Sequence, residues 1–112
     1  PSIIGMGWDA TDANVQIMHN DASGTATKVD LGFAVPTADR TAAYELELWC
    51  GDNSSPVLWW VTDLTTGTVY SGTITTDLPA SGYLASRGWC SVGGTSSVVG
   101  ISMMGQYAEL VP

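Results

Sequence analysis

Residues 44–78, YELELWCGDNSSPVLWWVTDLTTGTVYSGTITTDL, decide the fold of this chain. They predict three strands, 44–50, 57–62 and 68–75, separated by turns rich in Gly, Asp, Asn, Ser and Pro. The first strand alternates between apolar and polar residues, which is the period of a strand with two different faces. The second strand is apolar on both faces, and such a strand is usually covered on both sides. A three-stranded meander needs a second layer, and the rest of the chain should supply part of it.

The remaining sequence predicts further short strands, a turn after each of them, and no amphipathic helix. Glycines 5 and 7 inside the first of these strands predict a bulge or a close approach of another backbone. A hairpin joins the second and third, and the segment 32–40, which contains Pro36, is predicted to be irregular. These strands cover residues 2–8, 15–19, 25–30, 87–92 and 98–110. Seven or eight strands with this spacing predict an all-β antiparallel sandwich, jelly roll or barrel.

Composition restricts both the size of the fold and its partners. A chain of 112 residues forms one domain at most, and 45% hydrophobic with 12% charged residues is not the composition of a disordered chain. The net charge of −8 argues against binding to nucleic acid or to an anionic membrane surface. No apolar run approaches the ~20 residues of a membrane span. Low charge, many hydroxyls and five tryptophans favour a neutral partner, such as a glycan or a protein.

Two further features concern the chain ends and the thiols. The chain begins with Pro1, and no basic segment followed by an apolar run indicates a signal peptide, so we expect Pro1 to be a boundary within a longer polypeptide. Cys50 and Cys90 lie on predicted strands, where a free cysteine is commonly a small core residue. We expect two buried free thiols, and one disulfide between them is the alternative.

Five short runs are distinctive as sequences, beyond the strands and turns that they predict: 7–9 (GWD), 14–21 (NVQIMHND), 38–40 (ADR), 72–79 (GTITTDLP) and 92–97 (VGGTSS). Together they resemble a concanavalin A-like jelly-roll module of bacteriophage virion proteins, found especially in the C-terminal parts of tail fibres and tailspikes. The resemblance spans most of the chain and rests on whole segments, not on a catalytic signature. Such modules have earlier strands before the Gly-Trp-Asp run, so this chain, a single module over 1–112, resembles their C-terminal portion.

The resemblance implies a jelly-roll β-sandwich at the tip of a homotrimeric fibre or spike. Such a protein is made in the host cytoplasm and becomes part of the virion, where it closes the trimer and contacts a receptor or bacterial surface polysaccharide. One alternative is a purely structural capsid-fibre or assembly module without a ligand. Another is a secreted lectin of cellular origin. We predict no cofactor and no catalytic residue.

The tryptophans are the most informative side chains for binding. Trp59 and Trp60 are neighbours on one predicted strand, so they face opposite layers. Trp49 shares its face with Glu45 and Glu47 rather than with the apolar residues of its strand. One aromatic set therefore faces a second surface, which is another layer, a neighbouring subunit or a glycan.

Loops held by rigid sheets concentrate binding residues, so the turn-rich segments are the other candidates for ligand contact. Together with two of the tryptophans they give the predicted ligand-binding residues: Trp49, Asp52, Asn53, Trp60, Ser81, Tyr83, Thr95 and Ser96.

Two acidic groups have catalytic or metal-binding alternatives. Glu45 and Glu47 share one strand face roughly 7 Å apart, a spacing at which two carboxylates can hydrolyse a glycosidic bond. This gives a glycan hydrolase as an alternative function, although we expect the pair to belong to a solvated strand face. Asp9, Asp12 and Asn14 offer oxygen ligands suited to calcium, but turn chemistry explains all three and we predict no metal.

The basic residues and the single histidine are expected to be structural. His19 has no nucleophile motif near it and is predicted to be a structural residue at a strand end. Lys28, Arg40 and Arg87 are too scattered to form a basic patch. In an acidic chain each is expected to pair with a carboxylate, as Arg40 can with Asp39.

Overall fold

A computed structural model describes residues 2–37, 42–51, 56–79, 103 and 105–108. The chain divides into two compact units, Pro1–Gly82 and Tyr83–Pro112. All six strands of the described residues belong to the first unit. In the second unit only residues 103 and 105–108 are described, and none of these is in a strand. The prediction of a strand over 98–110 is therefore wrong for residues 103 and 105–108.

The first sheet contains β1 (Ser2–Gly7), β2 (Asn14–Asp21) and β3 (Thr27–Ala34), which are antiparallel and adjacent in chain order. β1 and β2 pair without a break in register, so the bulge predicted from Gly5 and Gly7 is wrong. β2 and β3 pair as the predicted hairpin, which confirms that prediction.

β3 continues three residues into the segment that was predicted to be irregular. Between Asn14 and Gln16 of β2 the register shifts, so β3 carries extra residues at this point. Gly32 has a φ of +77° there, a conformation that glycine adopts at no steric cost. The Asp30 Oδ1 atom accepts a hydrogen bond from the Gly32 N–H at 2.7 Å. The bulge thus lets the strand run on to Ala34, and the prediction of an irregular segment is wrong for 32–34.

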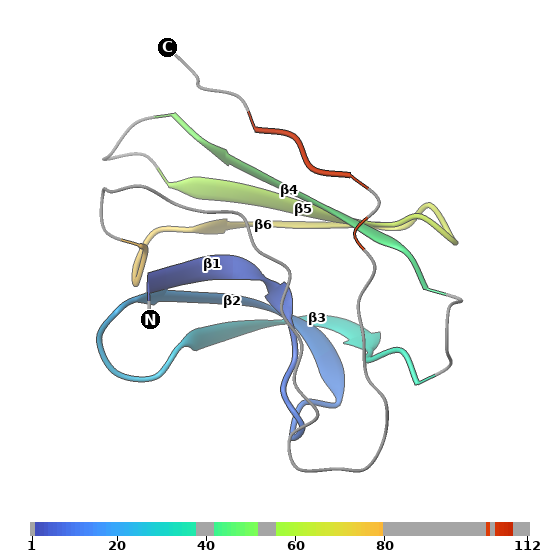
Figure 1. Cartoon of the computed structure of the whole chain (residues 1–112), viewed down its shortest axis with the longest axis horizontal. Helices are drawn as coiled ribbons and strands as arrows, with labels where there is room; N and C mark the ends of the chain where they lie inside the picture. The colour runs from blue at the N-terminus through green and yellow to red at the C-terminus, as the bar shows by residue number, and fades with distance from the viewer. Residues whose placement is uncertain (1, 38–41, 52–55, 80–102, 104, 109–112) are drawn as a thin grey trace. The chain divides into compact units, whose positions relative to one another are not determined.

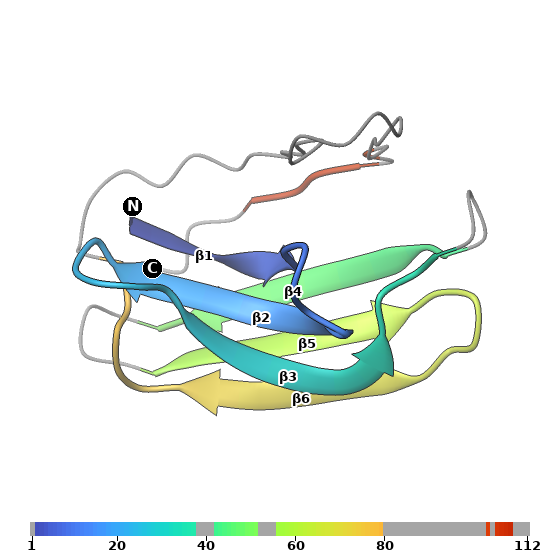
Figure 2. The ribbon, with the colours of Figure 1, turned by 90° about the horizontal axis from the view of Figure 1, so that it is seen from below.

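The second sheet contains β4 (Tyr44–Cys50), β5 (Val57–Asp63) and β6 (Val69–Ile74), again antiparallel and adjacent in chain order. Figure 2 shows the three strands of each sheet side by side. The meander predicted from residues 44–78 is confirmed, and no strand limit differs from the prediction by more than one residue.

One hydrophobic core joins the inner faces of the two sheets, which Figure 1 shows as two layers. Each sheet contributes three buried apolar side chains: Val15, Ile17 and Leu31 from the first, and Trp59, Val61 and Ile74 from the second. The predicted all-β antiparallel fold with two facing sheets is confirmed. The six strands pair only with their neighbours in sequence, so they contain no Greek key, and the jelly-roll topology stays a prediction.

Three aromatic rings close one end of the core. The Phe33 ring centroid lies 4.6 Å from that of Tyr70 and 5.4 Å from that of Tyr44, at separations typical of aromatic contacts. These contacts connect β3 with β4 and β6. Burial raises the pKa of the Tyr44 hydroxyl, because the low-dielectric surroundings disfavour the phenolate.

Trp59 fills the core only because its cross-strand neighbour is a glycine. Gly72 is paired with Trp59, and a Cβ atom at Gly72 would lie 2.5 Å from the nearest atom of the indole. Trp59 is 5% exposed, and its indole lies against Gly72 of β6. A larger residue at position 72 would have to displace a buried tryptophan.

The inner face of β4 extends beyond this core. Leu46 packs against it, whereas Leu48 is 39% exposed and Cys50 is exposed. The prediction of a buried thiol is therefore wrong for Cys50, because the core between the two sheets does not cover this end of β4. Cys90 and the predicted strand 87–92 lie outside the described residues.

Candidate functional site

The candidate binding surface is the side of the second sheet that is turned away from the core, called the outer face below. The strand register aligns its side chains in rows across the three strands. Each row takes one residue from each strand: Trp49, Leu58 and Thr73; Glu47, Trp60 and Ser71; Glu45, Thr62 and Val69.

Alternation along β5 places its two tryptophans on opposite sides of the sheet, as predicted. Trp59 is buried in the core, whereas Trp60 is half-buried on the outer face. Trp49 lies on the same face at the diagonal position and is 43% exposed. Diagonal neighbours on antiparallel strands have Cα atoms roughly 7–8 Å apart, within reach of aromatic side chains. The outer face therefore presents two indoles close together.

Two carboxylates lie in the adjacent positions of the same face. Glu47 is directly opposite Trp60, and Glu45 is opposite Thr62. Both glutamates are exposed, as predicted for a solvated strand face. The glycan-hydrolase alternative that uses this pair stays a prediction.

The described residues include two of the eight predicted ligand contacts. Trp49 and Trp60 share the outer face, so the structure brings them together. The other six fall in parts of the chain for which no placement is described: Asp52, Asn53, Ser81, Tyr83, Thr95 and Ser96.

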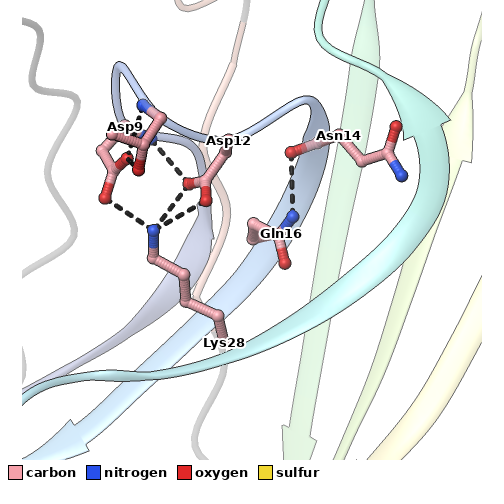
Figure 3. A network of polar contacts seen from close by, with 6 residues as sticks. Asp9, Asp12, Asn14, Gln16 and Lys28 are labelled. Carbon is pink, nitrogen blue, oxygen red and sulfur yellow. Dashed lines mark hydrogen bonds and ion pairs between the residues drawn. The ribbon is translucent and has the colours of Figure 1, made fainter.

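The loop between β1 and β2 holds the acidic group considered as a calcium site, shown in Figure 3. The Lys28 Nζ atom donates to Asp9 Oδ2 at 2.6 Å and to both carboxylate oxygens of Asp12 at 2.8 Å. Hydrogen bonds from Lys28 and Thr11 hold the pKa of Asp9 well below its usual range, and the two aspartates raise the pKa of Lys28. One ammonium group thus pairs with both aspartates. This confirms that Lys28 pairs with carboxylates.

Asn14, the third residue of that group, points to a different partner. Its Nδ2 atom donates to both oxygens of the Asp30 carboxylate at 3.0 and 3.1 Å. The Gly32 N–H and the Asn14 amide lower the pKa of Asp30. Within the described ranges no group of three or more His, Cys, Asp or Glu side chains could hold a metal ion.

A second polar cluster links β2 and β3 of the first sheet to the segment after β6. The buried His19 side chain donates from Nδ1 to the Asp77 carbonyl oxygen at 3.0 Å. The Asp77 carboxylate accepts from the Thr27 hydroxyl at 2.6 Å and from the Asp21 N–H at 2.9 Å. These two donors, Thr27 first, lower the pKa of Asp77. The predicted structural role of His19 is confirmed, and the cluster fixes the end of the meander to the opposing sheet.

Asp77 is not among the residues predicted to have a functional or structural role. The residue has a φ of +52°, which aspartate tolerates better than most side chains, and it follows a run of threonines. Aspartate at a strand end signals a turn, but its partners are 50 and 56 residues away in the sequence. Only the resemblance of the runs 14–21 and 72–79 to one module connected these segments.

No family model, curated protein or solved structure matches this chain. Among the residues described, no helix is long and apolar enough to cross a membrane.

Proposed function

We propose that this chain is a glycan-binding attachment module and that its contact surface is the outer face of the second sheet. The observation that carries the proposal is the pair of indoles on that face: Trp49, which is 43% exposed, beside the half-buried Trp60. Tryptophan is enriched where a protein meets a partner, and its ring stacks on the apolar face of a sugar. Thr62, Ser71 and Thr73 add hydroxyl groups that can bond to sugar hydroxyls.

The biological setting comes from the resemblance described above. A homotrimeric tail fibre or tailspike tip would present three copies of this surface to a bacterial polysaccharide. Each contact on an open sheet face is weak, and three linked contacts give a much higher avidity. The proposal therefore combines host-surface attachment with trimer formation. The purely structural module without a ligand is the alternative that the experiments must exclude.

A glycan array with a matched pair of tryptophan variants tests the binding surface. We expect Trp49→Ala and Trp60→Ala each to weaken binding about tenfold, because truncation of an aromatic contact at the centre of a binding surface commonly has an effect of this size. Trp8→Ala is the control, since Trp8 is 40% exposed but lies just after β1 of the other sheet. Equal losses for Trp8→Ala and Trp49→Ala would contradict the proposed surface. An array on which the wild-type protein binds no glycan would favour the structural alternative.

Light scattering tests the trimer separately. We expect the protein in solution at micromolar concentration to have the mass of three chains. A stable monomer at all accessible concentrations would remove the trimer and its avidity from the proposal, while leaving the binding surface to be judged by the array.

A further inference from the structure

We infer that the glycan recognised by the outer face carries positive charge, as a sugar with a free amino group does. This inference rests on the proposed function and names the ligand class for the same surface. The observations that carry it are two glutamates without partners, their positions beside the indoles, and the absence of a competing base among the described residues.

The two glutamates differ from every aspartate that the structure describes. Each of those aspartates accepts at least one hydrogen bond, from a lysine, an amide, a hydroxyl or a backbone N–H: Asp9, Asp12, Asp21, Asp30, Asp63 and Asp77. Neither Glu45 nor Glu47 has a hydrogen-bond or ion-pair partner within the described part of the chain. The aspartates are used to fix turns and strands, whereas the glutamates remain available to a ligand.

The register places this negative charge beside the aromatic surface. Glu47 is the direct cross-strand neighbour of Trp60, and Trp49 follows Glu47 by two residues on the same face. The face of an indole attracts a cation, and a carboxylate forms a short, charge-assisted hydrogen bond with an ammonium group. A sugar ring stacked on Trp60 could place an amino substituent near Glu47 without leaving the indole. A neutral sugar would use the indole and leave both carboxylates unpaired.

Charge also argues against two other occupants of this face. The described lysine, Lys28, is held by Asp9 and Asp12 on the first sheet and does not reach the glutamates. A second copy of this chain, whose net charge is −8, would bring carboxylates towards carboxylates if it docked here symmetrically. An acidic polysaccharide would meet the same repulsion. A cationic saccharide is the partner that matches the charge of the outer face.

Two oligosaccharides of the same backbone and length test the inference. A chitosan oligomer carries free amines, and the corresponding fully acetylated oligomer has none. By calorimetry at mildly acidic pH and low salt, we expect the amine form to bind about tenfold more tightly, since two exposed ion pairs together give an effect of that order. The preference should shrink at high salt because exposed ion pairs are screened.

Substitution of the two glutamates tests whether they cause the preference for the amine form. Glu45→Gln combined with Glu47→Gln should remove the preference, so that the amine form binds no more tightly than the acetylated form. Asp21→Asn is the charge control, since Asp21 is exposed on the other sheet and asparagine can keep the hydrogen bond to the Ser23 N–H. This control should retain the preference.

The outcomes separate the inference from the proposed function. Equal binding of both oligomers, or tighter binding of the acetylated form, overturns the positive-charge inference and leaves the glycan-binding proposal standing. Equal loss of both ligands in the double glutamine variant also overturns it, because the glutamates would then act as acceptors for sugar hydroxyls. A protein that binds neither oligomer nor any glycan on the array contradicts the inference and the proposed function together.

Discussion

Substitution of Gly72 by alanine should disturb the core through one buried ring. The added Cβ would lie 2.5, 2.7 and 2.9 Å from three atoms of the Trp59 indole, whereas ordinary van der Waals contact begins at 3.4 Å. The ring must therefore move by about 0.9 Å, which is the difference between 3.4 and 2.5 Å. Trp59 is 5% exposed and cannot turn into solvent without leaving the core. Gly72→Ala thus forces the core to repack around a displaced tryptophan.

The expected size of the effect combines two opposing contributions. Overpacking of a core costs typically 1–3 kcal/mol, on the order of 2 kcal/mol here. Replacing glycine by alanine also lowers the entropy of the unfolded chain, which stabilises by about 0.4–1 kcal/mol. We expect a net loss of about 1–2 kcal/mol in the free energy of unfolding. For a domain of this length that corresponds to a fall in Tm of roughly 4–8 °C.

Urea unfolding followed by tryptophan fluorescence measures this loss, with Gly5→Ala as the matched control. Gly5 is also in a strand, but no atom lies within 4 Å of a Cβ built there, so alanine should be neutral or slightly stabilising. In a Trp59→Phe background the smaller ring should relieve most of the effect of Gly72→Ala. The reasoning is refuted if Gly72→Ala is as stable as Gly5→Ala, or if its cost is the same with phenylalanine at position 59.

Three further predictions concern the polar clusters and the aromatic contacts. Lys28→Gln should raise the pKa of Asp9 towards its usual value, which a carboxyl NMR titration would detect; an unchanged pKa would contradict the role of this ammonium. Because its folded pKa is lowered, Asp77 stabilises the fold at pH above the unfolded value and loses this contribution as pH falls through the folded value. In thermal scans, Asp77→Asn should therefore lower Tm at pH 7 and lower it less at pH 3. Thr27→Ser keeps the hydroxyl donor and should change Tm little. An equal loss of Tm for Asp77→Asn at both pH values would argue against a contribution from the ionised carboxylate. Phe33→Leu removes two ring contacts and should cost about 1–3 kcal/mol in urea unfolding, and a cost below 0.5 kcal/mol would contradict the packing account.

Local pattern predicted much of the fold and the identity of the candidate surface. The alternation in residues 44–50 placed Trp49 with Glu45 and Glu47, and adjacency alone separated Trp59 from Trp60. Both results depend only on the twofold period of an extended chain. Pattern failed at Gly32, where a glycine with positive φ marks a bulge inside β3 rather than its end. A bulge and a strand end have the same local composition, and only the partner strand distinguishes them.

The sequence by itself determined the three-stranded meander of the second sheet, the hairpin of β2 and β3, and which side chains of a strand share a face. Only the tertiary structure decided which of the two faces of β5 lies in the core, that Cys50 at the end of β4 remains exposed, and that Asp77 is fixed to the first sheet. The physical reason is that alternation is set by each residue and its neighbours, whereas burial and long-range hydrogen bonds require another part of the chain to be in place. The two faces of a strand are defined by its own sequence, but which face is buried is decided only when the two sheets pack together.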